Sequence, residues 1–179
     1  MQGRMWTHKL KFGVLASVLA IAGSATLVAK TPTPDTLEHK VRHELLMLPR
    51  FTIFDNLSFR VDGNVVTLFG EVTQPVKKID AENAVKHLEG VTRVDNQIEV
   101  LPLSPLDNGI RVREYRALFS GPLYRYALGT QPSIHIIVKN GNVKLVGFVS
   151  SQSDRQLANI RANGVPGVFS VTNDLQVTK

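Results

Sequence analysis

One stretch of this 179-residue chain occurs twice, and the repeat limits the folds that the chain can adopt. Residues 61–100 align without a gap on residues 138–177, and eleven of the 40 aligned pairs are identical. Chance would give about two or three identities at ordinary residue usage. The identical pairs are mostly alternating apolar residues and turn glycines. The chain is therefore predicted to contain two copies of one small domain.

The size and composition of the copies bound their stability and chemistry. Each copy spans roughly 60–75 residues, where a single hydrophobic core is marginal, so we expect the two copies to pack against each other. An apolar content of 43% with 20% charged residues is ordinary for folded proteins. The chain has no cysteine, which excludes disulfides, thiolate catalysis, cysteine zinc sites and an acylated lipoprotein cysteine.

The first copy begins with a predicted helix at residues 37–48. Apolar residues recur there at intervals of four, four and three, while Asp35 is suited to cap the start and Pro49 to end the helix. His39 and His43 share one face of this helix at a spacing that can bind a metal. No third ligand is close in the sequence, so we predict no metal site.

The rest of the first copy shows strand, strand, helix and strand patterns. Alternating apolar residues predict strands at 57–61 and 66–72, joined by a hairpin turn. A helical stripe follows at 75–88, and a third strand at 94–100. Gly70 lies on the inner face of its strand, where we expect it to let a helix approach closely. This order predicts an α+β domain, α-β-β-α-β, with a three-stranded mixed sheet and two helices on one face.

The second copy keeps this pattern and differs most in its first helix, which is expected from Ile110 onward. We predict that Val112, Phe119, Leu123 and Tyr126 form the buried stripe of this region. Arginine mixed with tyrosine suits the headgroup region of an anionic membrane, but a core helix with solvated arginines is the alternative. The candidate residues for binding a lipid or a partner are Arg113, Tyr115, Arg116, Tyr124, Arg125 and Tyr126.

Residues 1–29 are predicted to be a secretory signal, because a short basic start precedes 18 uncharged, mostly apolar residues. This stretch is also close to the ~20 residues needed to span a bilayer, so an uncleaved anchor is the alternative. Both interpretations predict export of the two domains. The predicted organisation continues with a spacer at 30–34, a first domain at 35–101, a linker at 102–109 and a second domain at 110–179.

Charge and motifs argue against several function classes. Without the three basic residues of the leader, 18 basic and 15 acidic side chains leave a balance of +3, too mild to indicate nucleic-acid binding. The sequence contains no Gly-rich phosphate loop, nucleophile elbow or zinc-protease motif. We therefore predict a protein that is not an enzyme and needs no cofactor, with no catalytic or metal-binding residues.

Two sets of residues resemble the BON domain of bacterial envelope proteins. They are residues 63–72, Ala81 and residues 89–100 in the first copy, and residues 141–149, Ala158 and residues 167–177 in the second. The α-β-β-α-β fold that this resemblance implies agrees with the independent prediction above.

The resemblance also implies a location and a class of partner. BON proteins with a leader and two such domains are exported to the periplasm and are linked with osmotic stress, outer-membrane integrity and anionic phospholipids. In one lipid-binding member the contact falls on the first helix of the second domain, where this chain has its arginines and tyrosines. The resemblance thus implies a periplasmic protein that binds an anionic phospholipid membrane. A scaffold module that binds an envelope protein is the alternative.

Overall fold

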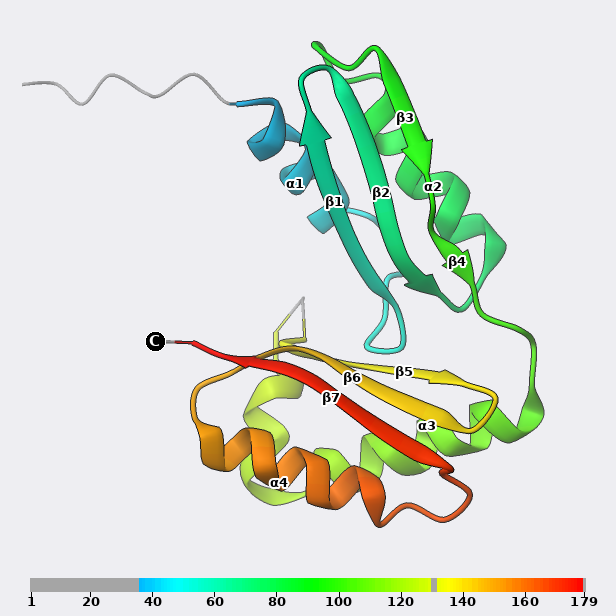
Figure 1. The fold of residues 1–179 in the computed structure, drawn as a ribbon, viewed down its shortest axis with the longest axis vertical. Coiled ribbons are helices and arrows are strands. Elements are labelled where there is room, and N and C mark those ends of the chain that lie inside the picture. Colours follow the sequence, from blue (N-terminus) through cyan, green and yellow to red (C-terminus); the bar gives the residue numbers. More distant parts are fainter. Residues whose placement is uncertain (1–35, 130–131, 179) are drawn as a thin grey trace, which may run out of the picture. The chain divides into compact units, whose positions relative to one another are not determined.

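The computed structural model describes residues 36–129 and 132–178, and it gives each repeat a sheet with helices on one face (Figure 1). The first repeat contains α1 (Leu37–Leu46), β1 (Asn56–Asp62), β2 (Val65–Val72), α2 (Pro75–Lys86), β3 (Arg93–Asn96) and β4 (Glu99–Val100). The second contains α3 (Pro105–Leu118), the 3-10 helix η1 (Gly121–Ala127), β5 (Ile134–Lys139), β6 (Asn142–Val149), α4 (Gln152–Asn163) and β7 (Ser170–Val177). The predicted α+β fold with two tandem two-layer domains is confirmed.

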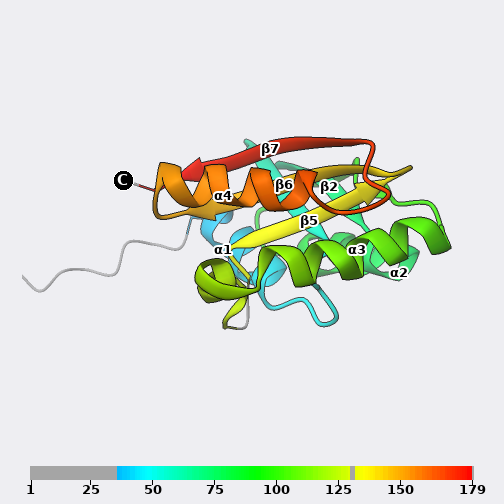
Figure 2. The same cartoon turned by 90° about the horizontal axis from the view of Figure 1, so that it is seen from below.

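Both sheets are mixed and have the same strand order. β2 lies between β1, which is antiparallel to it, and β3 with β4, which are parallel to it. β6 lies between antiparallel β5 and parallel β7 in the same way. The view of Figure 2 shows α3 and α4 lying along one face of the second sheet. The predicted third strand is continuous in the second repeat but divided into β3 and β4 in the first.

Different two-residue turns close the two hairpins and give them the same register. In the first repeat only Gly63 has positive φ, +61°, as a type II′ turn requires. In the second, Asn140 (+52°) and Gly141 (+76°) both do, as in type I′. Either turn makes the pair next to it, Asp62 with Val65 or Lys139 with Asn142, a hydrogen-bonded pair.

The glycines at positions 70 and 147 make room for a strand, not for the helix that we expected at Gly70. Gly70 has φ +115°, and a Cβ there would lie 2.1 Å from the carbonyl oxygen of Asn56 in β1. Gly147 has φ +124°, and a Cβ there would lie 2.1 Å from the carbonyl oxygen of Ser133. The prediction of a close helix was wrong, because the tight neighbour of each glycine is the backbone at the start of the antiparallel strand.

The aligned asparagines have the structural role that their position on the inner side of the strand suggests. Asn96 donates to the backbone oxygen of Lys78 and accepts from the amide of Ile98, at 3.0 and 3.2 Å. Asn173 repeats both bonds, to Arg155 and from Leu175, at 2.8 and 3.2 Å. Each asparagine therefore ties the third strand of its sheet to the helix that precedes it.

Two hydrophobic cores form, and the first repeat contributes to both. The first core gathers Val41, Val66, Leu68, Val85 and Ile98 among other residues. The second gathers residues of α3, η1, α4 and the second sheet, and it also includes Ile53, from the segment between α1 and β1. The backbone oxygen of Ile53 accepts a 2.8 Å hydrogen bond from the amide of Ile136. This contact fits the expectation that the copies share stability.

The start of α2 at Pro75 is as predicted, whereas the start of α1 differs in detail from the prediction. The cap of α1 is Thr36, whose side chain accepts from the amide of His39, and Asp35 lies outside the described residues. The predicted leader at 1–29 and the spacer at 30–34 also lie outside them. Ser151 caps α4 and accepts from the amide of Asp154 at 3.1 Å. Each cap satisfies an amide that has no partner within its helix.

Candidate functional site

The helix that carries most of the candidate residues begins at Pro105, five residues before the expected start. Ser104 caps it by accepting from the amide of Asp107 at 3.1 Å, and proline suits the first helical position because its missing N–H would have no helical partner. The N-terminal turn of α3 therefore lies in the sequence predicted to be a linker.

The buried face of α3 also differs from the predicted one. Its buried residues are Asp107, Ile110, Arg111, Glu114 and Leu118. Val112 is 46% exposed, so its predicted place in the core was wrong. The other three residues of the predicted stripe are buried as expected: Phe119, Leu123 and Tyr126.

Arg113 and Arg116 lie three residues apart on the exposed side of α3, so their side chains are neighbours. Arg113 donates from Nε to the backbone oxygen of Pro166 at 3.2 Å. Glycines flank its guanidinium: a Cβ at Gly109 or Gly167 would lie 3.1 or 3.3 Å from it. Within the part of the chain that the structure describes, neither arginine forms an ion pair, so both positive charges are available to a ligand.

Two exposed tyrosines accompany these arginines along the chain. Tyr115 lies on α3 with its ring centroid 5.2 Å from that of Phe119, which is buried. Tyr124 lies on η1 and is about half exposed. Tyr115 follows Arg113 by two residues, so it projects from a different side of the helix. Tyr115 therefore does not form one continuous face with the two arginines.

Arg125 and Tyr126 take part in an internal hydrogen-bond network at the start of α4. Arg125 donates to the carboxylate of Asp154 at 2.7 Å, and the buried hydroxyl of Tyr126 donates to the same carboxylate at 2.9 Å. Tyr126 also accepts from the amide of Ser150 at 2.9 Å. The hydrogen bond to Tyr126 and the negative charge of Asp154 raise the pKa of Arg125. These contacts give both residues a structural role, which leaves four exposed candidates: Arg113, Tyr115, Arg116 and Tyr124.

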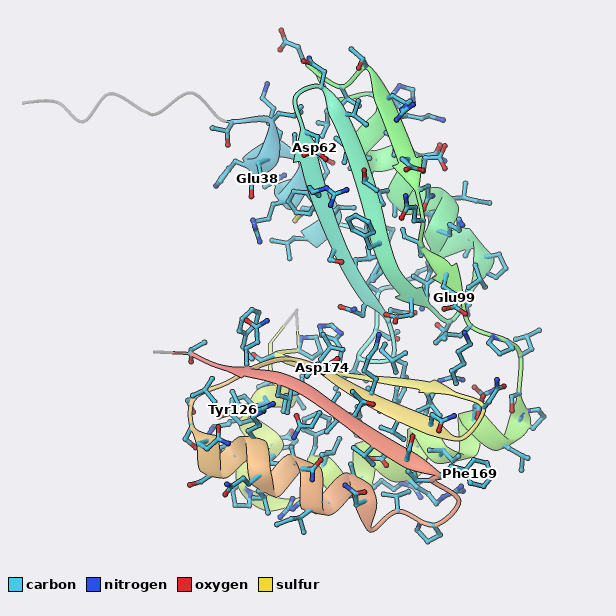
Figure 3. All side chains as sticks on the ribbon, in the orientation of Figure 1. Glu38, Asp62, Glu99, Tyr126, Phe169 and Asp174 are labelled. Carbon is cyan, nitrogen blue, oxygen red and sulfur yellow. The ribbon has the colours of Figure 1, made fainter. Side chains whose placement is uncertain are left out.

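Two exposed apolar side chains next to Arg113 were not among the candidates. Leu106 is 79% exposed and Phe169, on the loop before β7, is 83% exposed (Figure 3). Both line a cavity of about 440 Å³ that Ile110 and Arg113 also line. Leu106 falls in the expected linker, and Phe169 aligns with Thr92 of the first copy, so neither the pattern nor the repeat singles them out.

Two buried acidic side chains, Asp107 and Glu114, lie on the inner face of α3. Asp107 accepts from the amides of Asn140 and Gly141 at 2.9 and 2.8 Å, which fixes the β5–β6 turn to the start of α3. Glu114 is fully buried and neither of its oxygens has a hydrogen-bond partner. Burial raises the pKa of Glu114 to about 8, so this side chain is mostly uncharged at neutral pH.

The described residues contain neither a metal-binding cluster nor a candidate membrane-spanning helix. No group of three or more His, Asp or Glu side chains that could hold a metal occurs among residues 36–129 and 132–178. His43 lies 3.6 Å from Glu44 on the exposed face of α1. Across the same residues, no helix has the length and hydropathy of a membrane-spanning segment.

Comparison with known proteins adds one relative and two solved structures. The chain is 30% identical over 125 residues to osmotically-inducible protein Y of Escherichia coli (strain K12). The match covers 68% of this chain and 61% of that protein, so the chain spans less than two thirds of the relative.

The two solved structures are of CdsD, a structural protein of the type III secretion system of Chlamydia trachomatis, and one is of its C-terminal domain. Their TM-scores are 0.33 and 0.30, at 12% and 13% identity. The matches cover 80% of this chain and 98% and 93% of those chains.

One family model matches both repeats. The family model described as the BON domain matches residues 34–102 and again residues 126–179, which together are more than half of the chain. The two matches fall in the two repeats that the sequence and the fold show independently. The chain therefore belongs to the BON domain family and carries two copies of the domain.

Proposed function

We propose that this protein is an exported, non-enzymatic envelope protein that binds anionic phospholipid membranes through its second BON domain. Its membership in the BON family supports a role in the bacterial envelope. The relative that is named for osmotic induction supports a role in osmotic-stress tolerance or envelope integrity. The basic and apolar start of the chain supports export to the periplasm.

The observation that carries this proposal is the pairing of free cations with exposed apolar side chains on one surface. Arg113 and Arg116 have no acidic partner within the described parts of the chain. Leu106 and Phe169 adjoin Arg113 around one cavity and are almost fully exposed. We call these four residues the α3 surface.

The chemistry of the α3 surface suits the boundary of a bilayer. Guanidinium groups bind phosphate oxygens in a two-pronged geometry, and each basic side chain near an anionic leaflet contributes about 1 kcal/mol. Transfer of exposed leucine and phenylalanine side chains from water to the acyl boundary of the membrane lowers the free energy and so favours binding. Tyr115 and Tyr124 add amphipathic rings of the kind enriched at membrane interfaces.

Sedimentation with liposomes tests the proposal. The protein is mixed with vesicles of neutral phosphatidylcholine, and with vesicles that also contain phosphatidylglycerol, at low and high salt. We expect binding only to the anionic vesicles, with less bound at high salt because counterions screen the arginines. Absence of binding to either vesicle would contradict the proposal and favour the alternative, a scaffold that binds an envelope protein.

A further inference from the structure

A turn in the segment between α1 and β1 contacts the edge of the second sheet. β5 is the outer strand of that sheet, and its Ile136 amide donates to the backbone oxygen of Ile53 at 2.8 Å. The side chain of Ile53 is only 8% exposed and belongs to the second core. Ile53 lies in a turn that the hydrogen bond from the Asp55 amide to the backbone oxygen of Thr52 closes at 3.1 Å. One residue of this turn therefore satisfies an edge amide of β5 and fills an apolar site beside it.

The first sheet has an equivalent edge. Phe59 of β1 stands 77 residues before Ile136, and it pairs with Leu68 as Ile136 pairs with Leu145. In an antiparallel hairpin hydrogen-bonded and non-hydrogen-bonded pairs alternate from the turn, so the Phe59 amide points away from β2, as the Ile136 amide points away from β6. No residue in the described part of the chain accepts a hydrogen bond from the Phe59 amide outside the sheet.

The inward-facing side chains along β1 are less covered than their counterparts along β5. Those of β1 are only partly buried, whereas those of β5 are completely buried. The helical segments explain the difference, because α1 has 10 residues, whereas α3 and η1 have 14 and 7. The three aligned pairs are Leu57 and Ile134, Phe59 and Ile136, and Val61 and Val138.

A cavity of about 150 Å³ lies beside the free edge of β1. Leu45, Phe51, Leu57 and Phe59 form its apolar wall. Asp55, Asn56 and His135 line its other side, where Asp55 is paired with Lys77. A cavity of this volume can hold a group as large as benzene, so a branched aliphatic side chain can lie against the apolar wall. The edge of β1 thus offers an outward amide and an adjacent apolar wall, the two features that Ile53 contacts at β5.

The charge at this cavity indicates a second property of its ligand. Arg42 also lines the cavity, with its guanidinium carbon 5.4 Å from the ring centroid of Phe59. Its contact with Glu38 is 3.8 Å long and both side chains are well exposed, so this pair contributes little. An acidic side chain of a ligand would therefore find a cation at the mouth of the cavity.

We propose that the edge of β1 binds an extended segment of another protein by strand addition. A backbone oxygen of that segment accepts from the Phe59 amide, a branched aliphatic side chain enters the cavity, and an acidic side chain lies beside Arg42. A second copy of this chain does not supply the segment from residues 52–55, because Ile53 and Asp55 are buried in their own copy. This interaction is independent of the α3 surface and goes beyond membrane binding.

A peptide with the sequence of residues 50–56, Arg-Phe-Thr-Ile-Phe-Asp-Asn, is a defined probe, because its isoleucine contacts the edge of β5 within the chain itself. The peptide is titrated into the ¹⁵N-labelled whole protein. We expect saturable shifts and slower hydrogen exchange at the Phe59 amide. A peptide with aspartate in place of isoleucine should bind at least tenfold more weakly, because the cavity wall is apolar.

A matched pair of variants distinguishes specific binding at the edge of β1 from nonspecific binding of the peptide. Phe59→Ala should weaken binding at least fivefold, whereas Phe69→Ala should leave it unchanged. Phe69 is a suitable control because it is also on the first sheet and also lies under an arginine, Arg60, at 5.6 Å. Equal losses in both variants, shifts centred on Ile136, or no shift at Phe59 in the unmodified protein would each overturn the proposal.

Discussion

Lys77 and Asp154 occupy the same position in the two repeats, 77 residues apart, and carry opposite charges. Each is the third residue of the second helix of its repeat, and each pairs with a partner of reversed sign. Lys77 donates to Asp55 at 2.6 Å, and Asp154 accepts from Arg125 at 2.7 Å. The duplicated domain thus keeps an ion pair at this position with its charges exchanged.

The two pairs differ in burial, which decides how much each contributes to stability. Asp55 and Lys77 are both buried, and Asp55 also accepts from the amides of Thr52 and Thr73 at 2.9 and 2.7 Å. Burial alone would raise the pKa of Asp55, but the bonds from Lys77 and the threonines outweigh it and lower the pKa. Arg125, by contrast, is half exposed, so solvent screens its pair.

Lys77→Met should therefore be strongly destabilising, because it leaves the carboxylate of Asp55 buried without its cation. We expect a loss of about 3–5 kcal/mol in the free energy of unfolding, measured by urea denaturation at neutral pH. Lys86→Met, at an exposed position near the end of the same helix, serves as the control and should cost less than about 0.5 kcal/mol. Equal effects of the two substitutions would contradict the assigned role of the pair.

Glu114→Leu should stabilise the protein at neutral pH. Burial raises the pKa of Glu114 to about 8 from its ordinary value of 4.5, so the folded state holds a proton that the unfolded chain releases. Stability from this group is fully present below about pH 4.5 and is lost as the pH rises towards 8. We expect the variant to gain about 2–3 kcal/mol over the unmodified protein at pH 7.

The pH dependence of that gain is the stricter check. Denaturation of the two proteins between pH 4 and pH 8 should show a difference that is smallest at pH 4 and grows steadily with pH. Glu114→Gln should also lose the pH dependence, because it cannot ionise, but should be less stable than Glu114→Leu because its amide stays without a partner. A gain that does not change with pH would show that Glu114 is not protonated in the folded protein.

Gly147→Ala should be among the most destabilising single-methyl changes in the chain. Its backbone has φ +124°, and the added Cβ would lie 2.1 Å from the oxygen of Ser133. We expect a loss of about 3–5 kcal/mol, measured by thermal unfolding. Gly164→Ala adds the same methyl group at a negative φ with no contact under 3.5 Å, so its melting temperature should change by only a few degrees. Similar losses at both glycines would contradict the assigned close approach.

Ile53→Ala tests whether the first repeat completes the core of the second. Truncating this buried side chain should cost about 2–4 kcal/mol, and Ile79→Ala, on the exposed side of α2, should cost little. Hydrogen exchange locates the effect: amides of β5 should exchange faster in Ile53→Ala, beginning with Ile136. Faster exchange confined to the first repeat would show that Ile53 supports only its own domain.

The fold could be predicted from the sequence because the duplicated apolar pattern is local and strong. Alternation fixes the strands, the glycines mark their turns, and the second copy confirms each element of the first. The start of α3 was harder to predict, because Ser104 and Pro105 suit a helix start and a stiff linker equally well. The buried face of α3 was not predictable from apolar spacing because it includes Arg111 and Glu114, and Val112 was therefore placed in the core in error.

The candidate site could be predicted only in part, because its contacts join distant parts of the chain. The pattern shows that Arg113 and Arg116 share a helix side, but not that Phe169, more than 50 residues later, lies beside Arg113. It also gives no sign that Arg125 and Tyr126 are held by Asp154. Such pairings depend on how helices and loops meet in three dimensions, which residue spacing does not determine.

The most direct test of the α3 surface is a charge-matched comparison of liposome binding. Arg113→Ala/Arg116→Ala is compared with Arg42→Ala/Arg60→Ala, which removes the same charge from exposed arginines of the first repeat. At about 1 kcal/mol per arginine, the first variant should bind vesicles containing phosphatidylglycerol roughly 10- to 30-fold more weakly, and the second should bind like the unmodified protein. Equal binding by the two variants would contradict the assignment of membrane binding to the α3 surface.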